Sequence, residues 1–173
     1  MASALTDLTG SLGLTGGVNT VQSSNISSIE EAQKHVPFDI LEPSNVPEGY
    51  ELRHITLIPS PESGGRVTES NPLKIIGVML SYVSSAKSTT DFTGTFVIEQ
   101  FKGQRTSSYQ VGNGEKNRSE SIRGFDTDVW RGTNMDNKAQ AILVWSDTDR
   151  GLIFNMAGYL TEDEIISVAQ SLN

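Results

Sequence analysis

The spacing of apolar residues predicts a short helix near each end of the folded part of the chain. Ser28 with Glu31, and Thr161 with Glu164, have the spacing of a helix-capping box, and Pro37 ends the first pattern. Each capping pair precedes an apolar stripe on one helical face, formed by Ile29, Ala32 and Val36 in the first helix and by Ile165, Val168, Ala169 and Leu172 in the second.

Between the two helices, apolar residues either alternate with polar ones or run continuously over segments of strand length. Strands are expected at 50–58, 73–84, 93–101, 119–123, 125–131, 139–145 and 152–157, and the pattern admits a short strand at 107–111. The remaining connections are polar loops, the longest at 59–72 and 102–118. Short connections imply antiparallel neighbours. The sequence therefore predicts an α+β fold, a curved antiparallel sheet of about six or seven strands with the N-terminal and C-terminal helices packed on one face.

The first part of the chain differs in composition from the rest. Residues 1–26 are rich in Gly and Ser, which favours a flexible linker or tail, and residues 27–173 are expected to form a single α+β domain. The alternative for the tail is that its leucines dock on the domain or on a partner. These leucines are Leu5, Leu8, Leu12 and Leu14.

Charge and cysteine content exclude several classes of protein. The 173 residues carry a formal net charge of −8 and no cysteine. The acidic balance argues against nucleic-acid binding and against non-specific adhesion to an anionic membrane. Without cysteine there are no disulfides, no thiolate metal sites and no cysteine nucleophile.

Several of these segments together resemble a bacterial family, the domain of unknown function 4367. The likeness covers roughly residues 27–173 and is carried by Ile29-Glu30-Glu31-Ala32, by the Pro43-x-x-x-Pro47-Glu48-Gly49-Tyr50 run, by Ser81-Tyr82, by Leu143-Val144-Trp145 and by Leu160-Thr161-Glu162-Asp163-Glu164-Ile165. The resemblance implies an extracytoplasmic domain of anti-sigma-factor-like proteins and lipoproteins. It implies, more remotely, the half-barrel of lipoprotein carriers, and it transfers no catalytic residues. The loops 59–72 and 102–118 depart from the family pattern.

The polar residues that could carry chemistry are few. His35 and His54 are the only histidines, and Asp126 and Asp128 share one strand face. A structural role is the favoured interpretation for all four residues. One histidine alone builds neither a metal site nor a triad, and the aspartates are typical of turns. The basic residues Arg105, Lys116, Arg118 and Arg123 are interpreted as a solvated loop, with an anionic ligand or partner as the alternative.

Aromatic residues are the candidates for ligand binding. Most belong in the core by residue type, but a few could line a concave apolar surface. Tyr82, Trp130 and Phe96 are the candidate ligand-binding residues, because their strands carry apolar residues on both faces. No catalytic residue, no metal ligand and no cofactor is expected.

The sequence favours a non-catalytic, extracytoplasmic binding or sensing domain of a bacterial envelope protein. Residues 1–26 would be the spacer from a removed membrane or lipid anchor. The expected partner is an envelope protein, a peptide or a lipid, and not a nucleic acid. Two alternatives stay open at this point: a carrier that holds a lipid or another apolar ligand in a half-barrel, and a small hydrolase that uses Asp126, Asp128 or a histidine.

Overall fold

A computed structural model describes residues 26–60, 74–86, 94–103, 115–133 and 139–173. The elements in chain order are α2 (Ile29–Gln33), β1 (Tyr50–Pro59), β2 (Ile75–Ser84), β3 (Thr95–Lys102), β4 (Glu115–Ile122), β5 (Phe125–Thr133), β6 (Ala139–Asp147), β7 (Leu152–Gly158) and α3 (Glu162–Gln170). All the strands pair antiparallel in one sheet. The predicted α+β class and antiparallel sheet are confirmed.

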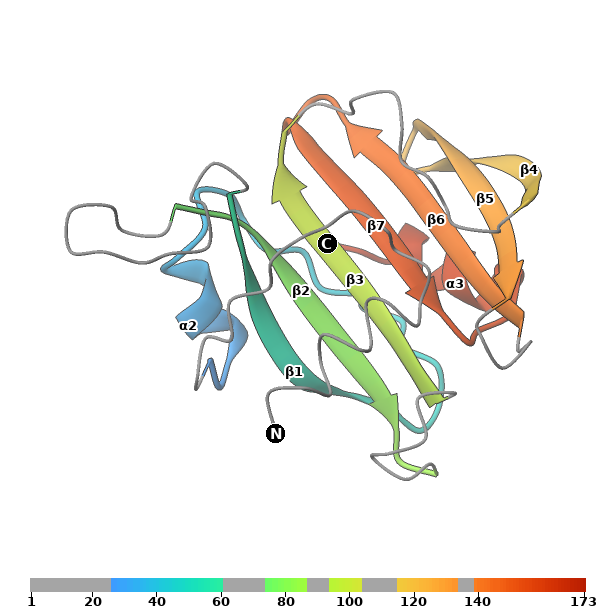
Figure 1. The fold of residues 1–173 in the computed structure, drawn as a ribbon, viewed down its shortest axis with the longest axis horizontal. Coiled ribbons are helices and arrows are strands. Elements are labelled where there is room, and N and C mark those ends of the chain that lie inside the picture. Colours follow the sequence, from blue (N-terminus) through green and yellow to red (C-terminus); the bar gives the residue numbers. More distant parts are fainter. Residues whose placement is uncertain (1–25, 61–73, 87–93, 104–114, 134–138) are drawn as a thin grey trace.

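The seven-stranded sheet has the order β1-β2-β3-β7-β6-β5-β4, with β1 and β4 at opposite edges (Figure 1). It consists of two meanders, β1-β2-β3 and β4-β5-β6-β7, that join where β3 pairs with β7. A single continuous meander would place β3 beside β4. The observed order instead brings the apolar strands β3, β7 and β6 to the centre and leaves the polar strand β4 at an edge. Burial of apolar surface favours this arrangement.

One face of the sheet shares a core with residues of both helices. We call it the helix-bearing face; its strands contribute Leu57, Val78, Leu80, Tyr82, Phe96, Ile98, Val129, Leu143, Trp145, Phe154 and Met156. Ala32 of α2 and Ile165, Val168 and Ala169 of α3 belong to the same cluster. The rings of Trp145 and Phe154 stack at 4.7 Å between centroids, which adds aromatic packing to the area buried there.

The segment between α2 and β1 is fixed to this core by side-chain amides. Gln100, fully buried in β3, accepts from the backbone N–H of Leu41 at 2.8 Å and donates to its carbonyl at 2.6 Å. Gln33 accepts from the N–H of Ile40 and donates to the carbonyl of Phe38 in the same manner. Both amides replace a strand partner that the segment lacks.

The segment between α2 and β1 also pairs with the end of the chain. Glu42 and Asn173 exchange two backbone hydrogen bonds, at 3.2 and 3.1 Å, and Pro43 forms an isolated bridge with Leu172. The last residues of the chain are therefore joined directly to the segment that precedes β1.

Both capping predictions correspond to observed helix starts. The Ser28 hydroxyl accepts from the N–H of Glu31 at 3.2 Å, and Thr161 forms the complete reciprocal box with Glu164. The first helix is shorter than predicted, because it ends at Gln33 rather than near Val36.

Strand β4 begins at Glu115, whereas the sequence predicts a loop through 118 and a strand at 119–123. Its first four residues are all polar, so no apolar alternation marks them. Backbone pairing with β5 forms this part of the strand. The predicted tail 1–26 (apart from Ile26), the strand at 107–111 and most of the loops 59–72 and 102–118 lie outside the described residues.

Candidate functional site

The second face of the sheet is apolar too. We call it the second face and define its core by Ile58, Met79, Val97, Ile142, Val144 and Ala157, which form a cluster separate from the core of the helix-bearing face. Neither α2 nor α3 contributes a residue to this cluster. A sheet face that meets only water normally carries polar residues. All six of these side chains are buried, with at most 4% exposed, so the second face is a core of its own to which no helix residue contributes.

A polar pair lies in the middle of this apolar face. Glu99 in β3 and Asn155 in β7 stand directly opposite each other, and the Asn155 amide donates to the Glu99 carboxylate at 2.9 Å. Glu99 is 4% exposed and Asn155 is fully buried. The strand register places Met79 and Val144 on either side of the pair. A carboxylate in an apolar environment is costly unless it is hydrogen-bonded, as Glu99 is here. Ligand sites commonly combine an apolar surface with a few polar groups of this kind.

Partly buried apolar side chains border the second face. They are Ile76, Phe101, Trp130 and Tyr159. The indole Nε1 of Trp130 is buried and has no hydrogen-bond partner in the structure, although buried indole N–H groups normally donate. On the neighbouring strand, Lys116 stands opposite Trp130 and forms an ion pair with Asp128 at 2.6 Å. This border combines aromatic surface, an unused donor and charge.

The three aromatic residues predicted to bind a ligand do not form one site. Tyr82 and Phe96 stack on the helix-bearing face, with ring centroids 4.8 Å apart and planes inclined by 2°. Both are buried there, and burial, with the nearby charge of Glu42, raises the pKa of Tyr82 to about 12. Trp130 lies against the second face. Of the three, only Trp130 is at the candidate site, and its role in binding stays a prediction.

The polar side chains considered for catalysis are spread over the domain. Asp126 is exposed on β5 and His54 is exposed on β1. His35 lies 3.7 Å from Glu31 in an exposed pair beside α2. Within the described ranges, no group of three or more His, Asp or Glu side chains is placed to hold a metal ion.

Asp147 has a structural role in a turn. Its carboxylate accepts from the backbone N–H of Arg150 at 3.0 Å and pairs with the guanidinium of Arg150 at 2.7 Å, which closes the β6–β7 hairpin. Gly151 completes the turn with φ of +64°.

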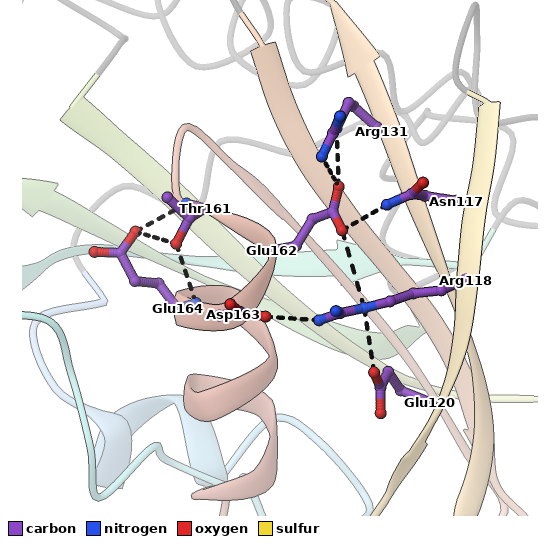
Figure 2. A network of polar contacts seen from close by, with 8 residues as sticks. All are labelled: Asn117, Arg118, Glu120, Arg131, Thr161, Glu162, Asp163 and Glu164. Atoms are coloured by element: carbon purple, nitrogen blue, oxygen red, sulfur yellow. Dashed lines mark hydrogen bonds and ion pairs between the residues drawn. The ribbon is translucent and has the colours of Figure 1, made fainter.

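Part of the basic cluster binds the start of α3 (Figure 2). Arg118 donates to Asp163 at 2.8 Å, and this hydrogen bond is the main reason why its pKa is raised. Arg131 pairs with Glu162 at 2.6 Å, and Asn117 donates to the other oxygen of that carboxylate at 2.7 Å. Acidic residues in a first helical turn are favourable on their own, and here they also attach the helix to the sheet. The sequence analysis missed this contact because 115–118 was interpreted as loop.

Comparison with known proteins defines the class of the domain. The chain belongs to the family described as Domain of unknown function (DUF4367), whose model matches residues 40–172. No curated protein and no solved structure matches the chain. In the part of the chain that the structure describes, no helix is long and apolar enough to cross a membrane.

Proposed function

We propose that this chain is a non-catalytic binding or sensing domain of a bacterial envelope protein, and that it recognises its partner through the second face of the sheet. The domain would act outside the cytoplasm, with residues 1–26 as the spacer from a membrane or lipid anchor. The favoured partner is an envelope protein or a peptide that presents an apolar segment. No cofactor takes part.

The observation that carries this proposal is the apolar character of the second face. The helix-bearing face supplies a core that joins the strands to both helices, and the second apolar cluster is separate from that core. The Glu99–Asn155 pair adds polar groups at the centre of that cluster, and the partly buried Phe101 and Trp130 at its border are the side chains that a partner would meet. Ligand sites typically combine an apolar lining with a few fixed polar groups.

A carrier of lipid or another apolar ligand is the second candidate. The same face supports it, because an acyl chain needs apolar surface and a head group needs polar contacts at a defined place. The border residues Phe101 and Trp130 would then meet the ligand first, since they are only partly buried.

Native mass spectrometry of the purified domain, followed by solvent extraction, separates the two candidates. A co-purifying apolar molecule that is lost in Trp130→Ala and Phe101→Ala supports the carrier. A ligand-free mass, with binding of an apolar peptide that the same substitutions weaken, supports the partner-binding domain. Tyr82→Phe is a matched control, because it changes an aromatic residue on the other face. If neither lipid nor peptide binding depends on Trp130 or Phe101, the second face is not the recognition surface.

A further inference from the structure

Strand β4 ends the sheet on one side and is the most polar of its strands. Five of its eight residues, Glu115, Lys116, Asn117, Ser119 and Ser121, are exposed. The outer edge of such a strand presents backbone N–H and carbonyl groups that can pair with another strand.

We propose that two copies of this chain associate by antiparallel pairing of β4 with β4, centred on Ser119. In that register Arg118 of each copy stands directly opposite Glu120 of the other. Ser119 meets Ser119, and the regular pairing starts at Arg118, because the register of β4 shifts between Lys116 and Arg118. Residues directly opposite each other in an antiparallel pair share one face, and opposite charges at such positions stabilise the pair. The two sheets would continue into one.

The charge order of β4 selects this register. A pairing centred on Arg118 would place the two Arg118 side chains opposite each other, and a pairing centred on Glu120 would place the two Glu120 side chains opposite each other. Like charges directly opposite are destabilising. The register centred on Ser119 instead places each Arg118 opposite a Glu120, so that both pairs have opposite charges.

The side chains are already held in suitable positions within one copy. Arg118 Nε lies 3.2 Å from Glu120 Oε1, and the other end of its guanidinium is fixed by Asp163 at 2.8 Å (Figure 2). The Arg118 side chain is 38% exposed and that of Glu120 is 34% exposed, so neither side chain is fully buried within one copy. An ordered guanidinium loses less conformational entropy when it pairs with a second carboxylate.

Sedimentation velocity of the full chain tests the proposal. The protein concentration is varied from about 10 μM to about 1 mM, the range in which a small interface associates. The wild type should shift from monomer to dimer as concentration rises, and added salt should oppose the shift. Glu120→Arg and Arg118→Glu should each weaken the dimer at least about tenfold, because each places like charges opposite one another twice. An equimolar mixture of the two variants should restore it, since their charges are complementary.

Glu51→Arg is the control, because it makes the same change of charge on the opposite edge strand, where Glu51 also pairs with a neighbouring arginine, Arg53, at 2.7 Å. It should leave the dimer unchanged. Hydrogen exchange of wild-type β4 amides, which should slow with concentration, gives a readout that does not depend on the folding of any variant. A wild-type chain that stays monomeric with exchange independent of concentration, or a variant mixture that does not regain association, would overturn the proposal.

Discussion

The two faces of the sheet are both apolar, but they are organised differently. The helix-bearing face shares a continuous core with α2 and α3, contains two stacked aromatic pairs, and uses its buried amide, Gln100, to hold a neighbouring backbone segment. The second face has a smaller cluster with no helix residue among the part described, and its central polar pair joins two side chains of the sheet itself.

In the proposed function, the helix-bearing face supplies stability and the second face supplies recognition. Polar groups on the helix-bearing face satisfy backbone groups that would otherwise be buried without partners, which is a structural role. Glu99 and Asn155 are hydrogen-bonded to each other across β3 and β7. A buried ionisable residue is costly in an apolar cluster unless it is hydrogen-bonded, as Glu99 is here.

The largest effect is expected where two strands approach most closely on the helix-bearing face. A Cβ added at Gly158 would meet the Cβ of Phe96 and lie 2.6 Å from its Cα, so the backbone of β3 or β7 must move. Gly158→Ala should lower the free energy of unfolding by about 3 kcal/mol or more, the upper end of the effect of overpacking, because backbone atoms rather than a flexible side chain are in the way. Gly103→Ala is the control, since its Cβ would meet only Ile153 at 3.7 Å. Equal denaturation midpoints for both variants would refute this packing.

Removal of the Gln100 amide should have the next largest effect. Gln100→Ala leaves the N–H and the carbonyl of Leu41 without their side-chain partner inside the core. Two such losses should lower the free energy of unfolding by about 2 to 4 kcal/mol, measured by urea denaturation. Amide exchange at Leu41 should accelerate more than exchange in β6. A variant as stable as the wild type would mean that the segment is held by its apolar contacts alone.

Asn155→Ala makes the corresponding change on the second face and should cost less. It removes one donor to Glu99, so we expect a loss of about 1 to 2 kcal/mol in the free energy of unfolding. If the second face is the recognition surface, Asn155→Ala should change ligand binding more than Gln100→Ala does. If Gln100→Ala, at matched folded fraction, impairs binding equally, the division of roles between the faces is wrong.

The smallest effect at neutral pH is expected for Tyr82→Phe, which instead changes the alkaline limit of stability. An unfolded tyrosine ionises near pH 10, whereas the pKa of Tyr82 in the fold is about 12. Between these values the unfolded chain releases the proton first, so stability falls by about 1.4 kcal/mol per pH unit. The variant should show a shallower decline, with the remaining slope due in part to Tyr50, whose pKa burial also raises. Identical pH profiles would show that Tyr82 is not shielded from water.

Local signals in the sequence predicted most elements, because caps and alternation act over a few residues. Ser28, Thr161 and Glu164 have the cap contacts that their spacing indicated. The start of β4 at Glu115 was missed, since strand pairing in a wholly polar segment depends on a partner strand that the local sequence does not specify.

The candidate site was less predictable for a related reason. Alternation shows that Tyr82 and Trp130 each lie on one side of a strand, but which sides coincide depends on strand order. The pairing of β3 with β7 links residues far apart in sequence, such as Glu99 and Asn155. No spacing rule identifies such a pair. Family membership supports the domain type and does not supply a site, because fold and function are separable.

Methyl NMR tests the central claim, that the second face is the recognition surface, most directly. The domain, labelled at Ile methyls, is titrated with dodecylphosphocholine below its micelle-forming concentration as an apolar probe. The account predicts a saturable shift at Ile76, which is partly buried at the border of the second face, and none at Ile55, which is partly buried against the core of the helix-bearing face. A shift confined to Ile55, or no saturable shift at Ile76, would contradict it.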